Sequence, residues 1–164
     1  MTIILKNKET LIYDDFFFRC CIGKKGLIKK KIEGDKKTPI GLFSIGNLYY
    51  RKDRKSKPFT KLKCIPITKN MGWCDDVKNK KFYNKLIKVN RNIRHEKLFR
   101  KDNKYDFIIP INYNSRNRKL GLGSAIFLHL TKNFRPTSGC VALKKKDFLI
   151  LIKLINRKTK IKLT

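Results

Sequence analysis

The first forty residues alternate short hydrophobic runs with polar turns, which is the pattern of a β-meander. Strands are predicted over residues 2–6, 10–13, 16–22 and 27–32. A polar loop at residues 34–39 leads to another strand-like run at 41–50, and a polar stretch follows at 51–58. The amino-terminal half is therefore expected to be mainly β.

The second half contains sharper patterns after an irregular stretch at residues 69–103, for which we predict one short helix around 96–101. Residues 105–113 alternate with a period of two, and Pro110 suggests an edge or a bulge. Residues 124–130 are apolar on both faces, as in a central strand. A helix and a short final strand are expected at 148–155 and 160–163.

Length and composition fit one folded domain covering residues 1–164, with 41% hydrophobic residues and no internal repeat. The formal net charge of +30 is the most unusual bulk property. Phosphates of a nucleic acid, anionic cell-wall polymers and codon bias would each explain it. Because the Lys and Arg residues are scattered along the chain, a solvated surface or codon bias is favoured.

No signal peptide is visible at the amino terminus, since Lys6, Lys8 and Glu9 interrupt the apolar start. The longest apolar run, residues 148–155, is broken by Lys153 and is too short to cross a bilayer. We therefore expect no stable membrane insertion.

Five cysteines without a CxxC pair argue against a disulfide framework or a zinc ribbon. Cys20 and Cys21 lie in an apolar run and are expected to pack inside a strand. Cys64 and Cys74 could join a histidine in a metal site, but that reading is disfavoured. We expect no metal and no organic cofactor.

Cys140 has a different context, because it follows a Pro/Gly turn and precedes an apolar segment. A thiol reacts as its thiolate and needs an imidazole or a positive field nearby. His129 lies eleven residues earlier, and a strand, a short loop and a return strand could bring the two side chains together. Spacing alone leaves open a hydrogen-bonded core histidine and a small buried cysteine.

Two sequence motifs, in the same order as in a known family, favour a catalytic role for Cys140 and His129 over a structural one. Residues 126–129 (Ile-Phe-Leu-His) followed by 136–143 (Pro-Thr-Ser-Gly-Cys-Val-Ala-Leu) resemble the catalytic signature of the L,D-transpeptidase (YkuD-type) family. Residues 34–43 look like a second conserved segment of that family, Gly-Asp/Lys-x-x-Thr-Pro-x-Gly-x-Phe. The resemblance implies a mainly β fold, a sandwich or partial barrel of two mixed sheets with one carboxy-terminal helix and short helices in the insertion.

The resemblance also implies a two-step acyl transfer on peptidoglycan tetrapeptide stems. Cys140 would be the nucleophile, His129 the general base and acid, and the backbone N–H of Gly139 part of the oxyanion hole. The acceptor would be an amine, giving cross-links or D-amino-acid exchange, or water. A monomer in the cell envelope or periplasm, without a nucleic-acid partner, is expected from this substrate class.

The chain departs from the family pattern at two positions. Many members carry His immediately before the Gly-Cys pair and Arg two residues after the cysteine, where this chain has Ser138 and Ala142. We expect the backbone carbonyl near Ser138, or its hydroxyl, to orient His129, and Arg135 and Thr137 to contact the substrate. The missing residues also leave open a catalytically silent peptidoglycan-binding domain, and the charge leaves open a nucleic-acid binder.

The remaining candidate residues are expected to have roles other than catalysis. His95 is expected to flank the substrate or begin a helix. Trp73 could line the substrate groove, but a sole Trp in a small domain more often belongs to the core. Thr38, Pro39 and Gly41 are expected to shape the fold near the cleft without reacting.

Overall fold

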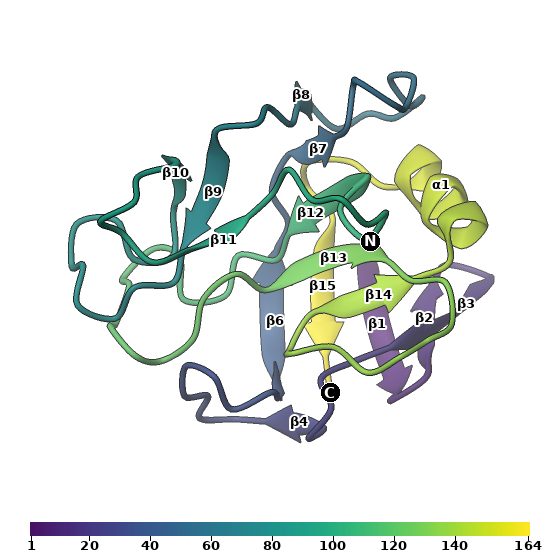
Figure 1. Cartoon of the computed structure of the whole chain (residues 1–164). Coiled ribbons are helices and arrows are strands. Elements are labelled where there is room, and N and C mark those ends of the chain that lie inside the picture. The colour runs from purple at the N-terminus through teal and green to yellow at the C-terminus, as the bar shows by residue number, and fades with distance from the viewer.

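A long, curled β-sheet and a single helix form the framework of the fold (Figure 1). The computed structural model describes the whole chain, Met1–Thr164. The amino-terminal strands are β1 (Thr2–Asn7), β2 (Thr10–Tyr13), β3 (Phe16–Cys21), β4 (Leu27–Ile28), β5 (Thr38–Pro39), β6 (Gly41–Ser44) and β7 (Leu48–Tyr50). The remaining elements are β8 (Cys64–Pro66), β9 (Met71–Cys74), β10 (Leu86–Lys88), β11 (His95–Lys97), β12 (Phe107–Pro110), β13 (Phe127–Leu130), β14 (Val141–Leu143), α1 (Lys145–Leu154) and β15 (Lys160–Leu163).

The main sheet has ten strands in the order β6-β15-β1-β2-β3-β14-β13-β12-β7-β8. It is mixed, because the pairs β1–β15, β13–β14 and β7–β8 run parallel and the other neighbours run antiparallel. Strands β10, β9 and β11 form a separate small sheet within the irregular stretch, and β4 pairs with β5. The small sheet supplies the wall opposite β13.

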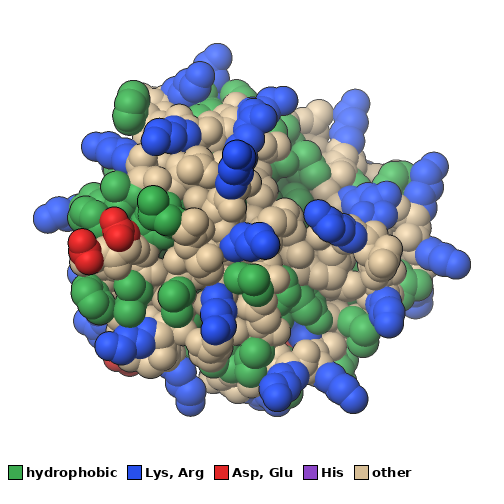
Figure 2. Space-filling view, turned by 180° about the vertical axis from the view of Figure 1, so that it is seen from behind, with side chains coloured by type: hydrophobic (Ala, Val, Ile, Leu, Met, Phe, Trp, Pro, Cys, Tyr) green, Lys and Arg blue, Asp and Glu red, His purple; other side chains and the backbone are tan.

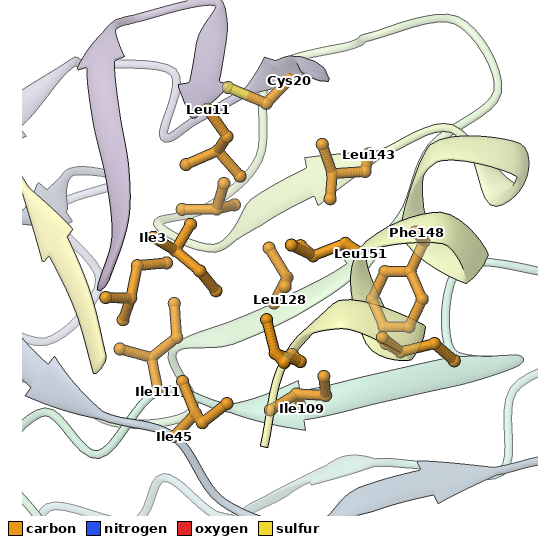
Figure 3. Close-up of a cluster of buried hydrophobic side chains, with 14 of the residues drawn as sticks. Ile3, Leu11, Cys20, Ile45, Ile109, Ile111, Leu128, Leu143, Phe148 and Leu151 are labelled. Atoms are coloured by element: carbon orange, nitrogen blue, oxygen red, sulfur yellow. The ribbon is translucent and has the colours of Figure 1, made fainter. Parts of the chain in front are cut away.

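The principal core lies inside the curl of the main sheet and is closed by α1 (Figure 3). Helix α1 buries Phe148, Leu151 and Ile152, which are spaced so that they share one helical face. They meet Leu128 of β13 and Leu143 of β14 in one cluster of 25 buried residues. Full burial of each Leu or Phe contributes about 1.5–3 kcal/mol, so this cluster fixes where β13 and β14 lie.

The opposite face of β13 packs into a second cluster that contains the candidate site. Successive side chains of a strand point to opposite faces, so Phe127 and His129 project away from Leu128 and the principal core. Phe127 and Cys140 belong to this second cluster together with Tyr105. One pair of strands thus contributes to the core on one face and to the site on the other.

The strand predictions are confirmed for β2 and β15 to the residue and for β1 and β3 within one residue at their ends. The predicted strand at 27–32 is wrong beyond Ile28. The predicted run at 41–50 is two strands, β6 and β7, which are separated at residues 45–47, where the N–H of Gly46 donates to the carbonyl of Pro110.

The fold prediction is confirmed as mainly β with one carboxy-terminal helix, but the short helices expected in the insertion are wrong. Residues predicted as a helix at 96–101 include the end of strand β11, whose Glu96 pairs with Trp73 of β9. Instead of two packed sheets, a single ten-stranded sheet curls over the core.

Lys and Arg are dispersed over the surface and do not gather in one dense patch on the face seen in Figure 2. Hydrophobic and uncharged side chains separate them, and acidic side chains are few there. The one helix, α1, is not long and apolar enough to cross a membrane.

Candidate active site

Strands β13 and β14 place His129 and Cys140 on the same side of the main sheet. The two strands run parallel, with Leu128 opposite Val141 and His129 opposite Ala142. Continuing this register puts Cys140 beside Phe127, so the cysteine and the histidine are diagonal neighbours. Diagonal cross-strand neighbours are about 7–8 Å apart at the backbone, within reach of long side chains. The loop from 131 to 140 therefore crosses over so that β14 runs parallel to β13, and the strand, loop and strand bring both residues to one face of the sheet.

Both side chains line one cleft with a volume of about 960 Å³. Cys140 is 8% exposed and His129 is 6% exposed, so reagents reach them only through this cleft. The small sheet contributes Glu96 to the opposite wall. The cleft thus lies between the main sheet and the insertion.

The thiol of Cys140 is held by two backbone groups. The N–H of Phe127 donates to Sγ at 3.3 Å, and the thiol donates to the carbonyl oxygen of Ala125 at 3.3 Å. Ala125 has a positive φ of 52°, an unusual conformation for a residue with a side chain. The thiol therefore keeps its proton and donates it in a hydrogen bond to the carbonyl of Ala125, and the sulfur makes no hydrogen bond to His129 in this state.

The imidazole of His129 is held by the backbone and by an aromatic ring. Nδ1 lies 2.9 Å from the carbonyl oxygen of Leu130, which fixes the proton of the neutral ring on Nδ1 and leaves Nε2 with a free lone pair. Tyr105 packs edge-on against the ring, with centroids 5.4 Å apart. The hydroxyl of Tyr105 donates to Glu96 on the facing strand β11. A neutral imidazole with free Nε2 can accept a proton.

Burial favours the uncharged forms of both groups. It raises the pKa of the Cys140 thiol to about 12, aided by the negative charge of Glu96 and opposed by the Phe127 N–H and by Lys31. Burial likewise lowers the pKa of His129 to about 4, against the hydrogen bond to Leu130. At neutral pH the resting pair is therefore a thiol and an imidazole.

The amino-terminal motif supports the turn that carries the cysteine. The hydroxyl of Thr38 accepts from the N–H of Gly23 at 2.9 Å and donates to the carbonyl of Gly139 at 2.8 Å. Gly139 has a φ of +138°, and a Cβ there would lie 2.9 Å from the carbonyl oxygen of Lys37. Only glycine fits between this loop and Cys140.

The sequence matches the protein-family model YkuD, the L,D-transpeptidase catalytic domain, over residues 1–163. The chain belongs to this family. No curated protein matches the chain.

One solved structure with this fold is the helical cell shape determining protein Pgp2 from Campylobacter jejuni. The likeness has a TM-score of 0.54 at 17% identity and covers 99% of this chain. The chain spans 46% of the length of that protein. At this identity the likeness concerns the fold.

Three of the predicted site residues have hydrogen bonds that differ from those expected of them in this YkuD domain. Ser138 lines the cleft but is exposed, and Leu130 takes the bond to His129 that was expected from Ser138. The Thr137 hydroxyl accepts from the N–H of Gly139 at 3.1 Å and donates to the carbonyl of Cys140 at 2.6 Å, so it is engaged inside the turn. The Gly139 N–H expected in the oxyanion hole is thereby already donated.

The other residues singled out in the sequence lie at the rim of the cleft or in strands of the small sheet. Arg135 is exposed at the cleft, and its contact with substrate stays a prediction. His95 lies in strand β11 and not at the start of a helix, and its Nδ1 is hydrogen-bonded to the carbonyl of Ile93. Trp73 packs edge-on against Phe127. The chain has no cluster of His, Cys, Asp and Glu arranged to hold a metal ion.

Sequence reasoning missed Asn84, a buried residue that joins the two walls of the site. Its side chain accepts from Trp73 Nε1 at 2.9 Å and from the N–H of Ala125 at 3.1 Å. It donates to the carbonyls of Tyr113 and Asn114 at 2.9 and 2.8 Å. All four hydrogen-bonding positions of the amide are thus used, and the Ala125 carbonyl that holds the thiol is fixed. A single Asn in an irregular stretch gave no signal of this role.

Sequence reasoning also missed Lys31 and the pair formed by Glu96 and Tyr105. Lys31 is only 3% exposed although charged, and it lines the cleft. Its position four residues before Asp35 of the amino-terminal motif is the one sequence signal that could have identified it.

Proposed function

We propose that the chain is a cysteine-dependent acyltransferase that cleaves the bond between an L-centre and the terminal D-Ala of peptidoglycan tetrapeptide stems. The observation that carries the proposal is the placement of Cys140 and His129 on one face of two adjacent strands, in one cleft. Membership of the YkuD family supplies the substrate class. Peptidoglycan as substrate assigns the protein to the cell envelope.

The first step forms a bond between Cys140 Sγ and the scissile carbonyl carbon and breaks the carbon–nitrogen bond to D-Ala. The thiol proton passes to Nε2 of His129 and then to the departing amine, which leaves as free D-Ala. The neutral tautomer fixed by Leu130 suits this transfer because Nε2 begins unprotonated. To reach Nε2, the thiol proton leaves its hydrogen bond to Ala125.

The second step releases the acyl group from the thioester. An amine of another stem gives a cross-link, a free D-amino acid gives exchange, and water gives the shortened stem. His129, neutral again after giving its proton to D-Ala, accepts the proton of the incoming nucleophile and returns it to the sulfur of Cys140 as the thioester carbon–sulfur bond breaks. No group outside the chain and its two substrates is needed to balance either step.

A catalytically silent peptidoglycan-binding domain is the second candidate. It is favoured by one observation, the elevated pKa of the buried Cys140 thiol, which leaves little thiolate at neutral pH. It predicts binding to isolated sacculi that survives Cys140→Ser, with no turnover that depends on the thiol.

Incubation with a disaccharide-tetrapeptide, followed by mass spectrometry, separates the two candidates. The enzyme is expected to release D-Ala and to carry an acyl group on Cys140, and both signals should vanish in Cys140→Ala. Cys64→Ala is a matched control, because Cys64 lies in β8 outside the cleft. Sacculus binding without either signal would leave the silent domain as the function.

A further inference from the structure

Lys31 is a buried cation whose side chain passes between two glycines. A Cβ on Gly123 would lie 2.8 Å from Cδ and Cε of Lys31, and a Cβ on Gly139 would lie 3.5 Å from its Nζ. Both glycines have positive φ, +102° and +138°. The backbone on either side is therefore shaped to let the lysine reach the turn that precedes Cys140.

The ammonium of Lys31 has unused hydrogen-bonding capacity. It makes one hydrogen bond, to Oδ1 of Asp35 at 2.5 Å. An ammonium has three N–H donors, so two remain for groups that enter the cleft. Asp35 does not depend on Lys31 alone, because the backbone N–H groups of Ile32 and Lys37 also donate to it.

Lys31 is also the cation that acts on the sulfur. Its positive charge lowers the pKa of Cys140 against the larger effect of burial. Other cations at the cleft, such as Lys36 and Arg135, are exposed and solvated, which weakens their fields. Among the cations of the cleft, the buried one is therefore placed to recognise an anion next to Cys140.

We infer that Lys31 binds the terminal carboxylate of the residue that Cys140 removes, and so restricts the enzyme to stems with a free carboxyl end. The inference rests on the proposed function and adds a residue that determines specificity. In such a substrate only the scissile nitrogen and one Cα separate the carboxylate from the carbonyl under attack. A cation beside the nucleophile therefore matches the spacing of the two groups.

Alkylation of Cys140 by iodoacetate and by iodoacetamide tests the cation without any peptidoglycan. The two reagents differ mainly in the carboxylate, so their rate ratio reports anion recognition at the sulfur. Lys31→Gln removes the charge and keeps a group that can bond Asp35. We expect the ratio of iodoacetate to iodoacetamide rates to fall about 5- to 10-fold in this variant. Lys36→Gln is the matched control and should keep the wild-type ratio.

An unchanged ratio in Lys31→Gln would overturn the inference whether or not the protein is a transpeptidase. Protection of the wild-type protein gives an independent check that needs no variant. A high concentration of D-alanine should slow the iodoacetamide reaction of Cys140, whereas D-alaninamide should not. Equal effects of the two compounds, or none from either, would also contradict the inference.

Turnover of two substrates then links the cation to specificity. With a tetrapeptide that ends in a free carboxylate, Lys31→Gln should lose about 10- to 100-fold in kcat/KM. With the corresponding terminal amide the variant and the wild type should be alike. Equal losses on both substrates would assign Lys31 a structural role, and failure of the wild type on both would count against the proposed function instead.

Discussion

The hydroxyl of Thr38 donates a hydrogen bond to the carbonyl of Gly139, 101 residues away in sequence, at 2.8 Å. This bond joins the two motifs that carry the resemblance to the YkuD family. The same hydroxyl accepts from the N–H of Gly23, so one buried side chain ties three segments together. The amino-terminal motif therefore acts on the site by supporting the turn before Cys140.

Thr38→Val keeps the shape of the side chain and removes both hydrogen bonds. The Gly23 N–H and the Gly139 carbonyl lose their buried partner, and we expect the free energy of unfolding to fall by about 1–3 kcal/mol. Iodoacetamide should then react with Cys140 at an altered rate, since the turn is no longer fixed. Urea denaturation and mapped alkylation measure the two effects.

Thr60→Val is the control for this variant. Thr60 accepts from the N–H of Leu62 and donates to the carbonyl of Ile152, the same two kinds of bond outside the cleft. It should destabilise the protein while leaving Cys140 alkylation at the wild-type rate. Equal changes in alkylation for both variants would mean that Thr38 acts only through global stability.

Gly139→Ala tests the close approach of the two motifs. The new Cβ would lie 2.9 Å from the backbone oxygen of Lys37 in a conformation that non-glycine residues rarely adopt. We expect a loss of more than about 2 kcal/mol in the free energy of unfolding. Gly34→Ala shares a positive φ of +80° but meets nothing within 4 Å, so it should cost only about 1 kcal/mol. Similar losses would refute a steric role for Gly139.

Glu96→Gln tests the electrostatic effect of the small sheet on the thiol. The carboxylate raises the pKa of Cys140, and a glutamine can still accept the Tyr105 hydroxyl. Loss of the charge should lower the pKa of the thiol and speed iodoacetamide alkylation at pH 8 by about 2- to 5-fold. Glu9→Gln removes an exposed carboxylate and should leave the Cys140 rate unchanged. No difference between the two variants would exclude this coupling.

The buried imidazole predicts a pH dependence of stability. The pKa of His129 is about 4 in the folded protein against 6.5 for an ordinary histidine, so the unfolded state binds the proton first as pH falls. Its contribution is complete above about pH 6.5 and is lost between pH 6.5 and about 4, by roughly 3 kcal/mol at most. His129→Gln should flatten the pH dependence of the unfolding free energy in this window. Parallel curves for the two proteins would contradict the burial of a neutral ring.

Much of the fold could be predicted because its strands carry strong local patterns. Residues Lys160–Leu163 alternate polar and apolar side chains, and Thr10–Tyr13 is a short hydrophobic run between polar residues; the structure matches both predicted strands to the residue. The prediction failed for residues 69–103, because the short strands there depend on pairing partners elsewhere in the chain. Glu96 pairs in β11 only because Trp73 of β9 lies beside it, and a three-residue strand leaves no period to detect.

The pair of Cys140 and His129 could be proposed from the sequence because the residue types are rare and lie in a recognisable motif. Their surroundings could not be proposed in the same way. The bond from His129 to Leu130, the tie from Thr137 to Cys140 and the four bonds of Asn84 depend on backbone positions fixed by tertiary packing. Lys31 was hidden because one buried lysine among many solvated ones looks the same in a sequence.

Trapping the acyl-enzyme tests the central claim most directly. The intact protein is mixed with a disaccharide-tetrapeptide, quenched in acid and digested, and each cysteine peptide is weighed by mass spectrometry. The account predicts an added acyl group on Cys140 alone, free D-Ala in equal amount within the first turnover, and neither product in His129→Gln. Release of D-Ala that persists in Cys140→Ala would contradict it.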